Sequence, residues 1–134
     1  MRERLPDVQF DEGRSPIDDL VRRCRLYIST YNATTFLESF TMNVPTVIYW
    51  NPDHWELRDS AVPYFDDLRR VGIFHESPVA AARHVAAIWD DIDAWWTSTE
   101  VRDVVERFKE RYSLLPDNLL ERVEHVLREA ASTA

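Results

Sequence analysis

Apolar residues occur along the chain in two patterns, as short continuous runs and as stripes at helical spacing. Four runs have the length and residue types of strands, and they cover residues 7–10, 25–29, 45–50 and 72–74. Six stretches have helical periodicity, and they cover residues 16–24, 33–43, 56–71, 77–96, 98–112 and 115–130. Since strands alternate with helices as far as the fourth strand, the pattern predicts a parallel sheet with crossover helices.

The predicted fold class is α/β, a Rossmann-like parallel sheet flanked by helices, with a C-terminal helical cap packed on it. We expect one domain over residues 1–134, with an α/β core over about 1–92 and C-terminal helices over 93–134. Ser77, which precedes a proline, is a predicted N-cap. Pro63 is predicted to break or kink the helix that contains it.

Composition and charge narrow the possible functions. Of the 134 residues 45% are apolar and 30% are charged, as in soluble globular proteins. Sixteen Lys and Arg against 24 Asp and Glu give a net charge of −8, which disfavours nucleic-acid binding. Two glycines are too few for a dinucleotide fingerprint or a Walker loop, and one cysteine excludes an internal disulfide. The chain has no apolar run of about 18 residues and no signal peptide, so we expect no transmembrane segment and a cytoplasmic location.

The turn after the strand at 25–29 is rich in hydroxyl groups. Its sequence, STYNATT, follows the carboxyl end of a predicted parallel strand, where such sheets bind their ligands. Helix N-terminal amides have no intrahelical partners and favour an anion, so the turn predicts a site for the diphosphate of an activated sugar. One turn further on, Glu38 could accept hydrogen bonds from a ribose diol. A purely structural role is the alternative, because Thr35 and Glu38 also fit a capping box.

A second polar cluster follows the strand at 45–50. The sequence YWNPDHWELR predicts an exposed group of side chains that faces the same crevice if the two strands are neighbours. Aromatic faces would stack on a sugar or base, and polar groups would bind hydroxyls or phosphate. The group comprises Trp50, Asn51, His54, Trp55, Glu56 and Arg58. There are structural alternatives, since Trp55 could cover the core and Arg58 could pair with Glu56 or Asp59.

Residues 7–112 resemble a known family. The hydroxyl-rich turn leads into a helix that carries Glu38, and the sequence NVP then opens the next strand. A polar loop with Arg58 follows, and after it comes a Leu-x-x-x-Gly element, here Leu68 to Gly72. This order resembles the donor-binding C-terminal domain of GT-B glycosyltransferases. More narrowly, it is similar to a family of transferases associated with bacterial surface-carbohydrate biosynthesis.

The resemblance implies half of a GT-B fold that binds a nucleotide sugar, with no metal and no other cofactor. It assigns the diphosphate to Thr30, Tyr31, Asn32, Ala33, Thr34 and Thr35. It assigns the ribose to Glu38, the sugar or phosphate to Asn51, His54, Glu56 and Arg58, and the nucleobase side to Gly13, Pro16 and Ile17. The catalytic residues stay unknown, because in that family the N-terminal acceptor domain usually supplies the base. The chain also differs from the family in having Tyr31 and Asn32 where many members have a glycine.

The predicted function is therefore the donor-binding half of a glycosyltransferase-like transferase of surface polysaccharide synthesis. Its expected partners are a nucleotide sugar and a missing N-terminal acceptor domain, or a second copy bound through that docking surface. We accordingly expect the chain to be incomplete and weakly active alone. One alternative is a polyol-phosphate transferase domain.

The other alternative is a non-catalytic interaction module or remnant. In that case four tryptophans would line a protein interface, namely Trp50, Trp55, Trp95 and Trp96. Adjacent residues do not share one helix face, so of Trp95 and Trp96 one should fill the core and the other should pack on a neighbouring element.

Overall fold

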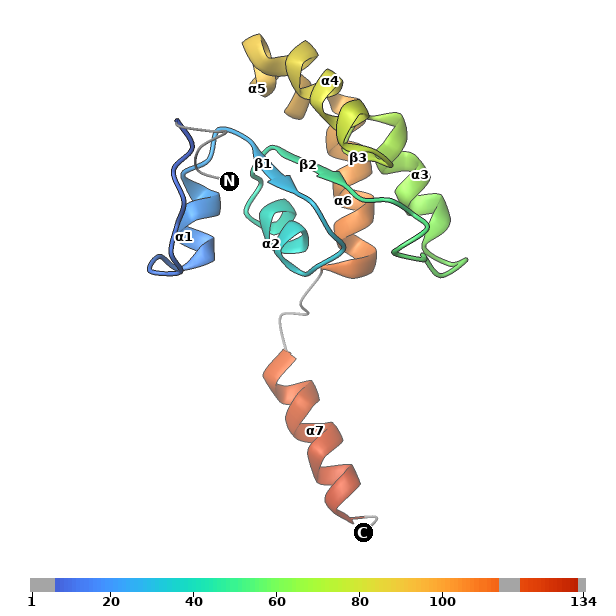
Figure 1. Ribbon diagram of the computed structural model, residues 1–134. Coiled ribbons are helices and arrows are strands. Elements are labelled where there is room, and N and C mark those ends of the chain that lie inside the picture. The colour runs from blue at the N-terminus through green and yellow to red at the C-terminus, as the bar shows by residue number, and fades with distance from the viewer. Residues whose placement is uncertain (1–6, 114–118, 133–134) are drawn as a thin grey trace.

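The computed structural model describes residues 7–113 and 119–132. In chain order its elements are α1 (Ile17–Arg22), β1 (Tyr27–Ser29), α2 (Thr35–Thr41), β2 (Thr46–Tyr49), α3 (Val62–Arg70), β3 (Phe74–His75), α4 (Pro78–Ile88), the 3₁₀-helix η2 (Trp89–Asp91), α5 (Ile92–Trp96), α6 (Thr99–Tyr112) and α7 (Leu119–Ser132). Within this part of the chain, the strands form one parallel sheet in the order β1-β2-β3 (Figure 1). The predicted α/β class and parallel sheet are confirmed.

The predicted first strand is wrong. Residues 7–10 form no strand, and Val8 and Phe10 are exposed. The run is four residues long and alternates apolar with polar residues, so it buries too little apolar surface to extend the sheet.

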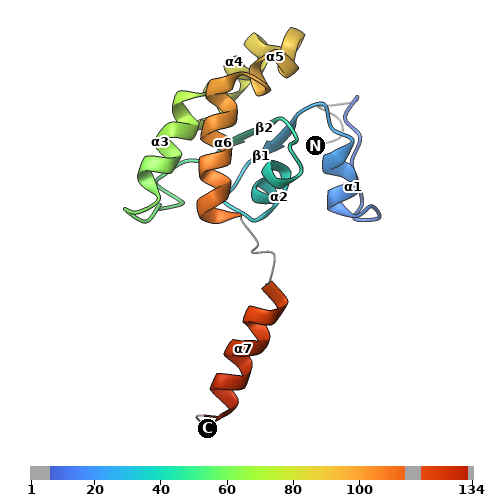
Figure 2. The same ribbon diagram turned by 180° about the vertical axis from the view of Figure 1, so that it is seen from behind.

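Helices pack on both faces of the sheet, although Ile28 of β1 stays 43% exposed on the face where α4 packs (Figures 1 and 2). α2 and α3 each contact α6 on one face, whereas α4 contacts β2 and β3. The side chains of β2 alternate between these two layers. Thr46 donates to the Ser39 hydroxyl of α2 at 2.8 Å, and Ile48 points to the same side, so Val47 faces α4. The first three residues of β2, Thr46 to Ile48, are buried because both faces are covered there, which explains the nearly continuous apolar run in the sequence.

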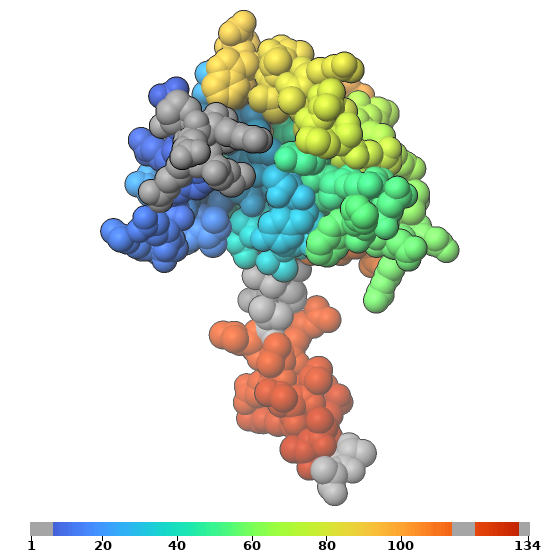
Figure 3. All heavy atoms as spheres, in the orientation of Figure 1, coloured from blue at the N-terminus to red at the C-terminus, as the bar shows by residue number. Residues whose placement is uncertain are grey.

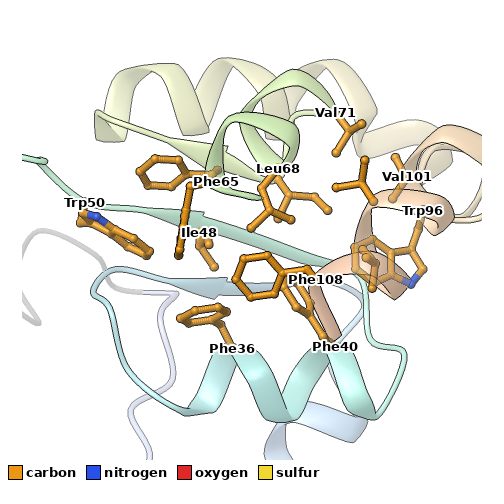
Figure 4. Packing of buried hydrophobic residues seen from close by; sticks show 14 residues of the cluster. Phe36, Phe40, Ile48, Trp50, Phe65, Leu68, Val71, Trp96, Val101 and Phe108 are labelled. Carbon is orange, nitrogen blue, oxygen red and sulfur yellow. The ribbon is translucent and has the colours of Figure 1, made fainter. Parts of the chain in front are cut away.

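The main hydrophobic cluster lies between the sheet and the helices α2, α3 and α6 (Figure 4). Phe108 of α6 occupies its centre. The ring centroid of Phe108 lies 5.3 Å from that of Phe65, 5.8 Å from that of Phe40 and 6.2 Å from that of Phe36. Several of these rings meet edge to face, which is a favoured aromatic geometry. α6 is therefore an integral part of the core, as the predicted helical cap requires.

Pro63 starts a helix and does not break one. α3 begins at Val62 with Pro63 in its first turn, and the preceding residues 56–61 form a loop. The predicted helix over 56–71, broken by Pro63, is therefore wrong at its start. In the first turn the missing N–H of proline removes no intrahelical hydrogen bond, and the fixed φ of the ring suits the helix.

The predicted helix over 77–96 is divided into α4, η2 and α5. The Ser77 hydroxyl caps α4 as predicted, and the Asp91 carboxylate caps α5, each accepting from the amide three residues further on. The prediction for the two tryptophans is confirmed. Trp96 is buried in the core, whereas Trp95 packs on the ring of His84 and donates to the carbonyl of Val71 at 2.9 Å.

α7 lies apart from the rest of the described chain (Figures 1 and 3). Four of its apolar side chains are exposed, among them Leu120 by 83% and Leu127 by 63%. The expected packing of the whole C-terminal segment on the sheet is therefore wrong for α7, because α6 already packs beside α2 and α3. The predicted start of this helix, residues 115–118, lies outside the described residues. None of the helices described here has both the length and the apolar character that crossing a bilayer requires.

Candidate functional site

The loops that follow β1 and β2 lie side by side at one edge of the sheet. β1 and β2 are parallel neighbours, with Tyr27 opposite Thr46 and Ser29 opposite Ile48. Their carboxyl ends therefore meet at the same edge, which is the edge where parallel sheets bind ligands. The condition that the sequence left open is met, and the two polar segments can contribute to one site.

A hollow of about 440 Å³ opens at this edge. Three parts of the chain enclose it: the start of α2, the loop before α3, and the last turn of α6. We call it the arginine crevice. Its lining residues are Asn32, Phe36, Leu37, Glu56, Leu57, Arg58, Ser60, Ala61, Phe65, Phe108, Arg111 and Tyr112. The floor is apolar and the rim is polar, which is the usual composition of a small-molecule site.

Arg58 and Arg111 are the two cationic side chains of the arginine crevice. Both are exposed, and neither forms an ion pair with any residue in the described ranges. Other arginines nearby are neutralised, since the guanidinium of Arg107 lies 2.9 Å from the carboxylate of Asp67 and Arg69 pairs with Asp66. The pairing of Arg58 with Glu56 or Asp59, considered from the sequence, does not occur. Two unpaired guanidinium groups on one hollow favour an anionic ligand.

The hydroxyl-rich turn contributes less to the crevice than the sequence suggested. Of the six residues assigned to the diphosphate, Asn32 lines the crevice, and no other one does. α2 is seven residues long, and no side chain caps its start. The capping box of Thr35 and Glu38 is therefore not formed. The carbonyl oxygen of Thr34 instead accepts from the amides of Leu37 and Glu38, at 2.9 and 3.1 Å.

Glu38 faces away from the arginine crevice. It lines a separate hollow of about 390 Å³ together with Asp18 and Arg22 of α1. Leu37 lines both hollows and stands between them. The structure thus places the predicted ribose ligand beside α1, on the side opposite Arg58.

Residues at and after the end of β2 have different roles: some stabilise the fold, and others are exposed or line the crevice. The Asn51 side-chain oxygen accepts from the amide of Asp53 at 3.0 Å, which shapes the turn. His54 is exposed and does not line the crevice, whereas Glu56 does. The expected exposure of Trp50 is wrong. Trp50 is 3% exposed and packs on Phe74, with ring centroids 4.6 Å apart, because it extends the buried face of β2.

The residues assigned to the nucleobase side lie before and at the start of α1. Gly13 has φ +78 in a turn where the carboxylate of Asp11 accepts from the amides of Gly13 and Arg14. The Arg14 amide, the Ser15 hydroxyl and the Gly13 amide lower the pKa of Asp11. Pro16 precedes α1 and Ile17 is exposed at its first turn. None of the three assigned residues lines the arginine crevice.

Three crevice residues did not stand out in the sequence. Ser60, Arg111 and Tyr112 line the crevice but belong to segments that read as ordinary helix surface. The ring of Tyr112 packs on Phe108 and Tyr64, with centroids 4.8 and 5.3 Å away. An amphipathic helix pattern gives no signal for this role, since it depends on where the end of α6 meets the sheet edge.

Metal ligands do not gather in the described part of the chain, where no group of three or more His, Cys, Asp or Glu side chains could hold an ion.

Among known proteins, the sequence model of the LIC12162 family transferases matches residues 1–127. No curated protein and no solved structure matches the chain.

Proposed function

The chain belongs to the LIC12162 family of transferases, and we propose that its arginine crevice binds the diphosphate of a nucleotide-sugar donor. The transferred sugar would then serve surface polysaccharide synthesis. The observation that carries the proposal is a pair of guanidinium groups, Arg58 and Arg111, that line one hollow at the carboxyl edge of the sheet and form no ion pair with the described residues.

Charge explains why a diphosphate suits this place. In a chain with a net charge of −8, most exposed cations gain by pairing with a carboxylate. Arg58 and Arg111 form no ion pair within the described ranges, and they come from two separate segments, the loop before α3 and the end of α6. A guanidinium binds phosphate oxygens through two parallel hydrogen bonds, so two of them would stabilise the charge that develops on a departing diphosphate.

The rest of the crevice suits the neutral parts of such a donor. Phe36 and Phe108 form an apolar floor for a ring, and the hydroxyl of Tyr112 and the amide of Asn32 offer polar contacts. Glu56 lines the same wall as Arg58 and could accept hydrogen bonds from sugar hydroxyls. A polyol-phosphate donor would use the same two arginines, and comparing the two donor types as substrates distinguishes them.

The test is a titration of the full chain with UDP, CDP and GDP, followed by amide NMR. We expect one of them to bind with a dissociation constant on the order of 1 mM, because the hollow is open and buries little of the ligand. Shifts should concentrate at three places, residues 30–38, 56–61 and 108–112. Arg58→Gln and Arg111→Gln should each weaken nucleotide binding about tenfold or more, since a hydrogen bond to a charged group contributes about 1.5–3 kcal/mol.

Arg83→Gln is the matched control. Arg83 is exposed on α4, on the other face of the sheet, and forms no ion pair among the described residues. Arg83→Gln removes one positive charge, as the two crevice variants do. Because Arg83 does not line the crevice, this control should leave nucleotide binding unchanged. The proposal is wrong if no nucleotide shifts these amides at millimolar concentration, or if Arg83→Gln weakens binding as much as Arg58→Gln. Sedimentation that depends on concentration, without nucleotide binding, would instead favour an interaction module that uses the exposed apolar face of α7.

A further inference from the structure

A second hollow, of about 500 Å³, lies on the other side of the loop before α3. We call it the aromatic hollow. It is enclosed by the segment from Trp50 to Val62, by α3, and by the end of β3. Glu56 and Leu57 line both this hollow and the arginine crevice, so the two are adjacent and share a wall.

Trp50 gives the aromatic hollow a buried donor without a partner. Trp50 lines the hollow, yet the residue is 3% exposed and its buried indole Nε1 has no acceptor among the residues described. In Figure 4 the nitrogen lies at the edge of the core cluster, on the side away from Ile48. A buried N–H that lacks an acceptor destabilises a fold, so a ligand oxygen that accepts from it would gain a strong contact.

The carboxylates around the hollow exclude an anionic ligand. Glu56, Asp59, Asp66 and Glu76 all line it. Arg69 is its cation, but that guanidinium already bonds the carboxylates of Asp66 and Glu76. Glu56 and Asp59 form no ion pair with the rest of the described chain. They are free to accept hydrogen bonds, and they would repel phosphate.

A cationic ligand fits the acids but not the aromatic groups. The indole N–H of Trp50 donates, and a cation offers it no acceptor. An aromatic cage for a cation needs ring faces on several sides, whereas Trp55, 43% exposed, is the only lining aromatic residue with a large open surface. The ring of Phe74 is already covered by the guanidinium of Arg69, 5.4 Å from its centroid.

We infer that the aromatic hollow binds a neutral saccharide ring. The apolar C–H face of the sugar stacks on Trp55, its hydroxyl groups donate to Glu56 and Asp59, and one of its oxygens accepts from the indole N–H of Trp50. A sugar hydroxyl both donates and accepts, which is the combination that these three groups require. The site is separate from the arginine crevice and does not depend on nucleotide binding there.

The experiment follows the indole N–H resonances of the full chain during titration with maltose, lactose and N,N′-diacetylchitobiose. Trp50→Phe identifies the Trp50 resonance. With at least one disaccharide we expect saturable binding and a downfield shift of the Trp50 indole proton, because it gains an acceptor. Glycerol offers hydroxyls without a ring face and choline offers a cation, and neither should produce that shift.

Trp55→Ala is the main variant, because Trp55 is exposed and its loss should not unfold the chain. It should weaken saccharide binding about three- to tenfold through the lost stacking. Asp59→Asn keeps the shape and should weaken binding through the lost charge. Trp89→Phe is the control, since Trp89 is also well exposed but lies in η2 and does not line the hollow. It should leave the affinity unchanged.

Two results would overturn the inference. One is that no disaccharide shifts the Trp50 resonance, and the other is that glycerol or choline shifts it as strongly as the sugars do. Nucleotide binding is read separately from the amides of residues 108–112, which lie outside the aromatic hollow. Failure of the saccharide site and failure of the proposed donor site are therefore distinguishable.

Discussion

Gly72→Ala tests the packing between the end of α3 and α4. The chain offers a matched control for it, Gly13→Ala. Gly72 and Gly13 both have positive φ, +81 and +78. A Cβ at Gly13 would meet nothing within 4 Å, whereas a Cβ at Gly72 would lie 2.7 Å from Nε2 and 2.9 Å from Nδ1 of His84. The two substitutions share the same backbone strain, and only one adds a steric clash.

The magnitude follows from how His84 is held. Its ring lies between those of His75 and Trp95, with centroids 5.2 and 5.0 Å away, and its Nε2 is buried. These two neighbouring rings restrict the rotation of the imidazole. A left-handed backbone costs an alanine about 1–2 kcal/mol, and overpacking adds about 1–3 kcal/mol. We expect Gly72→Ala to lower the free energy of unfolding by about 2–5 kcal/mol, and Gly13→Ala by at most about 2 kcal/mol.

Urea denaturation followed by circular dichroism measures both changes. In a His84→Ala background the clash is removed, so the cost of Gly72→Ala should fall to that of Gly13→Ala. The reasoning fails if Gly72→Ala and Gly13→Ala are equally costly in the unmodified chain. It also fails if His84→Ala leaves the cost of Gly72→Ala unchanged.

Two further predictions concern the core and the histidines. Phe108→Ala should lower the free energy of unfolding, measured by urea denaturation, by about 3–5 kcal/mol. Val79 is exposed, so Val79→Ala should change that free energy by less than about 0.5 kcal/mol. A small effect of Phe108→Ala would contradict the packing of α6. Burial lowers the pKa of His75, and burial together with the neighbouring imidazole lowers that of His84. The unfolded chain therefore binds protons first as the pH falls below about 6.5, so both groups stabilise the fold above that pH and the stabilisation is lost on acidification. His84→Leu should flatten this pH dependence of the urea midpoint, and His54→Gln, on the exposed loop, should not.

The strand at 45–50 could be read from the sequence because both faces of β2 are covered, whereas the pairing of β1 with β2 came only from the structure. Val47 and Ile48 are buried on opposite sides, so successive residues of the run are apolar instead of alternating with polar ones. The same reasoning failed at residues 7–10, where a short alternating run has no strand beside it. It also failed at Trp50, since a residue that follows a strand can still face the core.

The candidate site was only half predictable. Asn32, Glu56 and Arg58 follow strands, and a parallel sheet brings strand ends together, so the sequence pointed to them. Arg111 enters the crevice because the last turn of α6 reaches the same edge, and that depends on how the aromatic core orients the helix. Helical periodicity identifies the buried face of α6 but does not reveal what lies beyond its end.

The shared wall of the two hollows gives their chemistry a joint consequence. Glu56 and Leu57 separate the two hollows. Among the described residues, the first has two arginines without ion pairs, and the second has carboxylates, aromatic rings and an indole N–H without an acceptor. The arginine crevice favours a phosphate group. It does not repel the neutral sugar ring that the aromatic hollow would bind, because that ring carries no charge. A ligand with a diphosphate at one end and a sugar ring at the other would gain from both hollows. Its second contact would form at the high effective concentration that the covalent link provides. Two weak sites on an acidic surface can in this way select an activated sugar over free phosphate and over free saccharide.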